Sequence, residues 1–324
     1  MIKKFISYRF FDKTKPQDRM PELSIIIPVY NEEENIVPLF NELIKFVPEN
    51  FELLFIDDGS TDQTFPQIDH LSKTDARIKC ISFSRNFGHQ NALMAGMDFA
   101  TGKYIITMDG DFQHPPSCFP TILEHLKEGY DIVSTRRANT KDINLFKKYF
   151  TKIFYHLINF ISDIPIQENV SDFRGFNSKV LFTIHKFEER DLFLRGIFSW
   201  IGFKKIVIPF EAPSRIHGKS KYSVVKMISL ALRGATSFSF RPLRISLLVG
   251  TFVSLLSFIL LIMAIVAYYQ GKTVPGWASI MTVVTFMGGI QLLVIGLMGE
   301  YVASLFRESK KRPLYIINEK INID

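Results

Sequence analysis

Short apolar runs alternate with amphipathic segments along the first two hundred or so residues of the chain. Between the runs, apolar residues recur at helical spacing, most clearly over residues 35–47 and 91–100. The runs themselves are rich in β-branched and aromatic residues, which predicts strands at residues 23–29, 52–57, 78–83, 103–108, 131–134 and 205–209. Strands that alternate with helices predict a mostly parallel, Rossmann-like sheet, so the expected fold class is α/β.

The pattern changes beyond Arg241, where charged residues almost vanish. Residues 245–269 and 275–299 form two uncharged, largely apolar runs, each longer than the roughly 20 residues that cross a bilayer. Two buried helices of a large soluble core are the alternative, but such helices normally carry a polar stripe, which these runs lack. The sequence therefore predicts a two-helix transmembrane hairpin.

The basic residues around this hairpin predict its orientation. Arg241 and Arg244 precede the first span and a basic cluster at 307–312 follows the second, whereas the connecting loop holds only Lys272. By the positive-inside rule both flanks are cytoplasmic. We expect a multi-pass protein of the plasma or inner membrane with its soluble domain in the cytoplasm.

Five segments follow from this organisation. Residues 1–20 are basic and amphipathic and lack the long apolar core of a cleavable signal peptide. Residues 223–242 either lie in the membrane interface or form a soluble helix packed on the sheet. The full expected division is 1–20, a catalytic domain at 21–222, an interfacial segment at 223–242, the hairpin at 243–303 and a cytoplasmic tail at 304–324.

The formal net charge of +7 raises the question of nucleic acid. The basic residues cluster near the N-terminus and around the spans, where anionic lipid headgroups attract them, so we expect a bilayer partner and no nucleic acid. Cys80 and Cys118 are expected to be free thiols, as is usual in a cytoplasmic domain.

Polar residues follow the predicted strands, where ligands of parallel sheets bind. Asp109-Gly110-Asp111 comes after one apolar run, and two such carboxylates can hold one Mg²⁺ or Mn²⁺, with Gln113 near enough to join. A solvated turn is the alternative for an isolated Asp-x-Asp. Asp57 and Asp58 follow another run and can accept hydrogen bonds from a base or ribose, although this stretch also suits a helix N-cap. Dinucleotide-binding and Walker glycine motifs are absent from the sequence, which disfavours dehydrogenases and P-loop enzymes.

Three ordered motifs resemble family 2 glycosyltransferases of the GT-A fold. They are the run Ile25 to Glu32, then Asp57-Asp58-Gly59-Ser60, then the run Asp109 to Pro116. The resemblance extends through the hairpin and is greatest to polyisoprenyl-phosphate glycosyltransferases of the GtrB type, which are related to dolichol-phosphate mannose synthase. It implies inverting sugar transfer dependent on Mg²⁺ or Mn²⁺.

The resemblance also implies roles for single residues. The segment Ser171 to Arg174 and the loop Arg215 to Tyr222 resemble basic segments of the family, and Arg136 matches its basic residue after the fifth strand, with Arg137 as the alternative. The implied nucleotide pocket is Pro28, Tyr30, Glu32, Asp57, Asp58, Asp109 and Arg136. The implied metal ligands are Asp109, Asp111 and Gln113, and the implied catalytic residues are Asp111, Arg174, Arg215 and Lys221.

The expected reaction needs no strong base, because a phosphate monoester has a second pKa of roughly 6 and is already anionic at neutral pH. The site must instead supply cations for two anionic substrates. We expect glucose transfer from UDP-glucose to undecaprenyl phosphate, with GDP-mannose, UDP-N-acetylglucosamine and UDP-aminoarabinose derivatives as alternative donors. The resemblance further implies a homo-oligomer, with a tetramer as one form.

Two other functions fit parts of the pattern. A non-catalytic membrane sensor could bind a nucleotide sugar, but it has little reason to keep both metal carboxylates and the basic loop. A processive polysaccharide synthase normally needs more spans and a Gln-x-x-Arg-Trp motif, which this sequence lacks.

Overall fold

The computed structural model describes residues 20–138, 170–190, 193–211, 241–271 and 276–323. These residues fall into two compact units, and each is described by itself. One holds the sheet and its helices together with the last residues of the chain, and the other holds the apolar hairpin. The segments 1–19 and 212–240, and Lys272 in the hairpin loop, lie outside the described residues.

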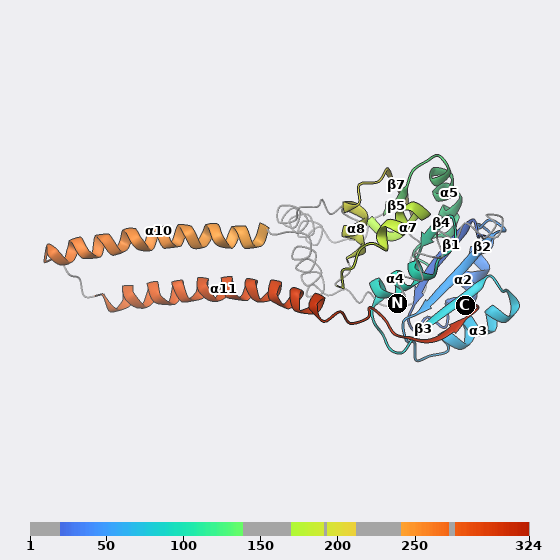
Figure 1. Cartoon of the computed structure of the whole chain (residues 1–324), viewed down its shortest axis with the longest axis horizontal. Helices are drawn as coiled ribbons and strands as arrows, with labels where there is room; N and C mark the ends of the chain where they lie inside the picture. The colour runs from blue at the N-terminus through green and yellow to red at the C-terminus, as the bar shows by residue number, and fades with distance from the viewer. Residues whose placement is uncertain (1–19, 139–169, 191–192, 212–240, 272–275, 324) are drawn as a thin grey trace. The chain divides into compact units, whose positions relative to one another are not determined.

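An eight-stranded mixed sheet, ordered β7-β5-β6-β4-β1-β2-β3-β8, forms the centre of the first unit (Figure 1). Strand β1 pairs in parallel with β2 on one side and β4 on the other, whereas β6 runs antiparallel to β4 and β5. The mostly parallel α/β class is thereby confirmed. The strands are β1 Leu23–Val29, β2 Phe51–Asp57, β3 Ile78–Phe83, β4 Tyr104–Thr107, β5 Ile132–Arg137, β6 Val170–Asn177, β7 Lys205–Phe210 and β8 Ile317–Ile321.

Helices cover the sheet, and every residue of β1 and β2 is buried. Strands buried on both faces are continuously apolar, which is why these runs are so readable in the sequence. A Cβ at Gly96 would lie 2.2 Å from Ile26 Cγ2, so α4 packs directly on β1. The helices are α2 Ile36–Leu43, α3 Thr64–Thr74, α4 His89–Phe99, α5 Phe119–Lys127, α7 Ser178–Ile184 and α8 Leu194–Trp200, with a short 3₁₀ turn, η2, at Pro116–Cys118.

The end of the chain returns to the sheet as β8, which pairs antiparallel with β3. Just before it, the Tyr315 ring stacks on Phe83 with centroids 5.0 Å apart, and its hydroxyl donates to Asp98 Oδ2 at 2.7 Å. The sequence analysis predicts a cytoplasmic tail at 304–324 and no strand within it. Residues Arg312–Asp324 of this tail group with the first unit, and β8 lies among them.

The second unit contains helices α10 Arg241–Tyr269 and α11 Trp277–Ser309. Large apolar side chains point outward along both, with Leu247 70% and Leu292 72% exposed. The candidate membrane spans are Leu243–Ala267 and Phe286–Ser309, so the second lies further along the chain than the predicted 275–299. An apolar surface of this extent is stable in lipid and costly in water, which supports a membrane-associated protein.

Candidate active site

The carboxyl ends of β1, β2 and β4 lie at the same end of the sheet, where these parallel strands finish. The Asp58 N–H donates to Val29 O at 2.9 Å, and the Met108 N–H donates to Ile26 O at 3.0 Å. These bonds continue the parallel ladders past the strand ends. The three motifs singled out in the sequence are therefore brought together here.

Asp57 and Asp58 are buried and shape the loops around them. Asp57 accepts hydrogen bonds from the Ser60 N–H at 2.9 Å and from the Ser82 hydroxyl at 2.7 Å. Asp58 accepts from the Phe87 N–H at 2.6 Å and the Gly88 N–H at 2.9 Å. Burial raises the pKa of Asp58, and these two backbone donors partly offset the rise. Both carboxylates therefore stabilise the loops that follow β2 and β3.

Three other residues of the expected nucleotide pocket lie at or just beyond the carboxyl end of β1. Tyr30 is 41% exposed just beyond β1, and the Glu32 N–H donates to Thr64 Oγ1 at 2.9 Å. Pro28 is buried opposite Ile56 in the β1–β2 ladder. Their contact with a nucleotide stays a prediction.

Asp109 and His114 form a fixed turn after β4. The Asp109 N–H donates to His114 Nδ1 at 2.9 Å, so His114 is neutral with its proton on Nε2, which lies 2.6 Å from Ser171 Oγ. Burial lowers the pKa of His114 despite the nearby carboxylates, consistent with this neutral form. The imidazole also stacks on Phe173. His114 therefore fixes the backbone at Asp109.

Gln113 links the second carboxylate of the motif to a cation. Its Nε2 donates to Asp111 Oδ2 at 2.9 Å, and its Oε1 accepts from Arg137 Nη2 at 2.7 Å. Between the two arginines that the sequence left open, Arg137 is the one joined to the acidic motif. Arg136, the preceding residue of β5, is exposed, and its contact with a nucleotide stays a prediction.

The residues that follow β4 fit a divalent cation. Asp109 Oδ1 is buried without a hydrogen-bond partner, with His89 Nε2 3.5 Å away, and Asp111 lies two residues on. Within the described ranges, no three His, Cys, Asp or Glu side chains are disposed to enclose a metal ion. An ion held by Asp109 and Asp111 would therefore complete its shell with phosphate oxygens and water, as Mg²⁺ commonly does.

A second polar cluster lies beside the first, on β6. Asp172 accepts from Arg195 Nε at 3.0 Å and Nη2 at 2.8 Å, and from Arg174 Nη2 at 3.1 Å. Arg174 is only 3% exposed, and its guanidinium lies 4.4 Å from the centre of the Phe198 ring. His89 Nε2 lies 3.8 Å from Asp172 Oδ2 and so connects this cluster to Asp109.

Sequence reasoning did not single out His89 or Arg195, and it named His114 and Ser171 only as members of longer motifs. His114 follows the acidic motif closely enough to have been considered by itself, whereas His89 and Arg195 reach the site only through tertiary packing. The predicted Arg215 and Lys221 lie outside the described residues, and their roles stay predictions.

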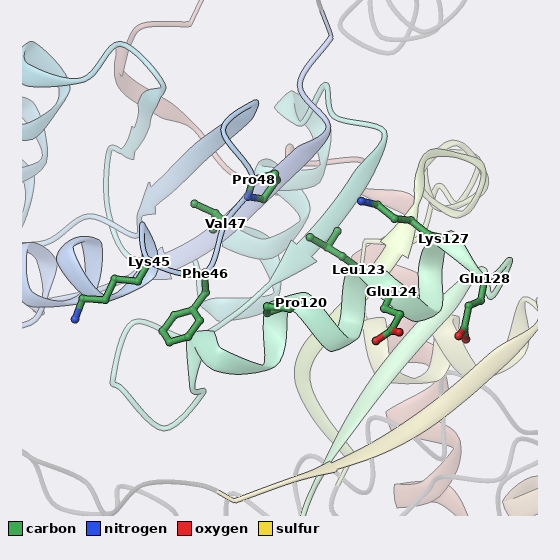
Figure 2. Close-up of a pocket in the computed structure, with 9 residues that line it drawn as sticks. All are labelled: Lys45, Phe46, Val47, Pro48, Pro120, Leu123, Glu124, Lys127 and Glu128. Atoms are coloured by element: carbon green, nitrogen blue, oxygen red, sulfur yellow. The ribbon is translucent and has the colours of Figure 1, made fainter.

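A cavity of about 710 Å³ lies at the opposite end of the sheet, where the parallel strands begin (Figure 2). It is lined by Lys45 to Pro48, which precede β2, and by α5 residues such as Leu123 and Lys127. Lys127 also pairs at 2.7 Å with Glu22, just before β1. Because these residues stand at strand beginnings, the cavity is separate from the acidic site.

Comparisons with known proteins agree over nearly the whole chain. The model of glycosyl transferase family 2 matches residues 24–184, and that of the GtrB C-terminal hairpin matches 241–305. The uncharacterized glycosyltransferase YkcC of Bacillus subtilis is 38% identical over 94% of this chain and 95% of its own. The bactoprenol glucosyl transferase of Shigella phage SfV is 39% identical over 92% of this chain and 99% of its own.

Among solved structures, a mannosyltransferase from Pyrobaculum calidifontis in complex with GDP-Man and Mn²⁺ is 16% identical, with a TM-score of 0.47. The match covers 95% of this chain and 92% of that one.

Proposed function

Because the chain belongs to glycosyl transferase family 2 and carries a GtrB C-terminal hairpin, we propose that it transfers glucose from UDP-glucose to a polyprenyl phosphate. The observation that carries the proposal is the match, over almost its full length, to bactoprenol glucosyl transferases. Undecaprenyl phosphate is the acceptor we propose, on the cytoplasmic face of the plasma or inner membrane.

We infer that the donor binds along the carboxyl ends of β1 and β2. The side chains proposed to face it are Pro28, Tyr30, Glu32, Asp57, Asp58 and Arg136, whereas Gln113 joins Arg137 to Asp111. Asp109 and Asp111 would hold Mg²⁺ or Mn²⁺, with Gln113 as a third proposed ligand. When bound, the ion would neutralise charge on the departing diphosphate.

Transfer on this proposal is a single displacement with inversion. An oxygen of the acceptor phosphate forms the bond to the anomeric carbon, and the bond from that carbon to the UDP oxygen breaks, with UDP leaving with the electron pair. The phosphate is already ionised, so the protein's residues have to orient it and offset its charge rather than remove a proton. Arg215 and Lys221 stay proposed contributors to that positive field, together with Arg174, which is buried.

The hairpin has a physical reason on this proposal. A polyprenyl tail stays in hydrocarbon, because each buried CH₂ stabilises it there by about 0.8 kcal/mol. The enzyme must therefore work at the headgroup plane, and a chain fixed in the same bilayer keeps its site there. Assembly into a homo-oligomer, such as a tetramer, is part of the same proposal.

The proposal is tested with membranes that contain the protein, undecaprenyl phosphate and one labelled sugar nucleotide at a time. We expect label from UDP-glucose, and not from GDP-mannose or UDP-N-acetylglucosamine, to enter the organic extract. Label from GDP-mannose alone would replace glucose by mannose, and none from any donor would reject the transfer.

Asp111→Asn removes one of the two carboxylates proposed to hold the ion. We expect it, and excess chelator on the wild type, to lower transfer at least a hundredfold while thermal unfolding of the purified protein stays unchanged. Asp69→Asn is the control, because Asp69 lies on α3 in an exposed pair with Lys73. Full activity of Asp111→Asn, or of wild type in chelator, would refute the metal assignment.

A further inference from the structure

Two arginines share the buried carboxylate of Asp172, but they differ in access to solvent. Arg174 is almost fully buried, whereas the Arg195 side chain is 38% exposed. Its two bonds to Asp172 fix the plane of the guanidinium, and bidentate pairs of this kind are among the most strongly oriented side-chain contacts. Arg195 is therefore a positioned cation that an anion from solvent can reach.

Asp172 is ionised, and two arginines share its carboxylate. Burial alone would raise the pKa of Asp172, but Arg195 and Arg174 outweigh it and hold that pKa well below its ordinary value. Burial lowers the pKa of Arg174 to about 10, so it too stays charged at neutral pH. Arg195 is the more exposed of the two arginines.

Packing places Arg195 next to the acidic motif. His89 Nε2 lies 3.5 Å from Asp109 Oδ1 and 3.8 Å from Asp172 Oδ2. The next residue, Gln90, accepts the Leu194 N–H at 3.1 Å and so joins the start of α8 to the start of α4. Arg195 follows Leu194 directly, and two independent contacts therefore hold it at the edge of the site.

The order of strands separates the two sides of the site. The motifs proposed for the nucleotide follow β1 and β2, on one side of β4, and the Asp172 cluster lies on β6, on the other side. The acidic motif after β4 stands between them. A nucleophile that attacks opposite the leaving diphosphate must approach from the side away from the nucleotide, which is the β6 side.

We propose that Arg195 binds the phosphate of the acceptor, a lipid phosphate monoester, and that Asp172 holds the arginine in place for this contact. The inference rests on the proposed transfer to a polyprenyl phosphate, but it assigns the anion contact to a residue that no sequence motif indicated. Arg174, in this arrangement, supports Asp172 from within the protein.

The test measures binding without turnover. Purified protein in detergent is titrated with farnesyl phosphate, farnesol, inorganic phosphate and UDP, for the wild type and for Arg195→Ala and Arg195→Lys. Arg77→Ala is a matched control, because Arg77 makes the same two-bonded contact with Asp75. Arg77 Nε donates at 3.0 Å and Nη2 at 2.7 Å, just before β3 begins and so at the opposite end of the sheet from the site.

Loss of a hydrogen-bonded cation at a phosphate typically weakens binding about tenfold or more. We expect Arg195→Ala to weaken the binding of farnesyl phosphate by that factor and to leave the affinities for farnesol and UDP within about twofold of the wild type. In the transfer assay it should raise the acceptor KM more than it lowers kcat. Arg195→Lys should recover part of the affinity, because it keeps the charge but loses the planar fork. Arg77→Ala should change none of these values.

Three results would overturn the inference. They are unchanged farnesyl phosphate affinity in Arg195→Ala, an equal loss of UDP affinity, and inorganic phosphate binding as tightly as farnesyl phosphate, which would remove the lipid as ligand. Binding of farnesyl phosphate through Arg195 by a wild type that transfers no sugar would refute the proposed function and leave this inference standing.

Discussion

At the scale of single residues, the acidic motifs build the site before they bind anything. Asp58 holds the Phe87 and Gly88 amides, and Asp57 holds Ser60 and Ser82. The same loop crossing depends on Gly59, where φ is +73° and a Cβ would lie 2.5 Å from the Arg85 carbonyl carbon. Only glycine allows the turn after β2 and the loop after β3 to approach so closely.

Gly59→Ala should therefore destabilise the protein by more than backbone strain alone. A left-handed conformation costs an alanine roughly 1–2 kcal/mol, and the contact with Arg85 adds to it because backbone atoms must shift. Gly129→Ala is the control, since its φ is +93° but its Cβ would meet nothing within 4 Å. Thermal unfolding should show a larger loss for Gly59→Ala, and equal losses would mean that the close approach does not matter.

The sequence predicts site residues that lie close together along the chain, but it misses residues that only helix packing brings to the site. Asp109, Asp111 and Gln113 follow one apolar run, and Gln113 Nε2 donates to Asp111 Oδ2, whereas their joint binding of a metal ion stays a prediction. His89 begins α4 and Arg195 lies in α8, so their meeting at Asp172 depends on how those helices pack. Arg174 shows the reverse case, because its motif resembles a phosphate-binding segment while its side chain is buried against Asp172 and Phe198.

At the scale of elements, the parallel strands are predicted well and the antiparallel ones are not. Strands β1 and β3 match the predicted ranges, because both consist largely of buried apolar residues. Strand β6 carries Asp172 and Arg174 inside its run, and β8 has the polar centre Asn-Glu-Lys. Neither shows a continuous apolar run, and β8 joins its partner across more than two hundred residues of chain, so no local signal predicts either strand.

Removing residues 313–324 should expose the outer edge of β3. The backbone groups of β3 that pair with β8 would then lose their partners, and unpaired edges exchange and associate more readily. We expect hydrogen exchange of the β3 amides in the full-length protein to become at least tenfold faster on truncation. Tyr315→Phe keeps the backbone ladder and removes only the bond to Asp98, so its effect on β3 should be small. Unchanged exchange in the truncated protein would show that β8 does not protect this edge.

At the scale of the whole molecule, the chain combines a soluble-type domain with a hairpin whose surface is apolar. The first unit buries its hydrophobic residues in the usual way, whereas α10 and α11 expose theirs along their length. One sequence therefore follows two solvation rules, and the change between them marks where water is expected to give way to lipid. The charged residues at the change, Arg241 and Arg244 on one side and Lys310 on the other, set the expected direction of insertion.

This orientation is tested with single cysteines and a maleimide that does not cross membranes. Gln270→Cys lies at the exposed end of α10 next to the hairpin loop, and Lys310→Cys lies at the exposed end of α11. With both flanks in the cytoplasm, Gln270→Cys should react in intact cells, and Lys310→Cys should react only after the membrane is opened. Cys80 is buried, and Cys118 is in the domain expected to be cytoplasmic, so the unmodified chain serves as the blank in intact cells. The opposite labelling pattern would place the acidic site on the outer face, away from cytoplasmic sugar nucleotides, and would contradict both the topology and the proposed donor.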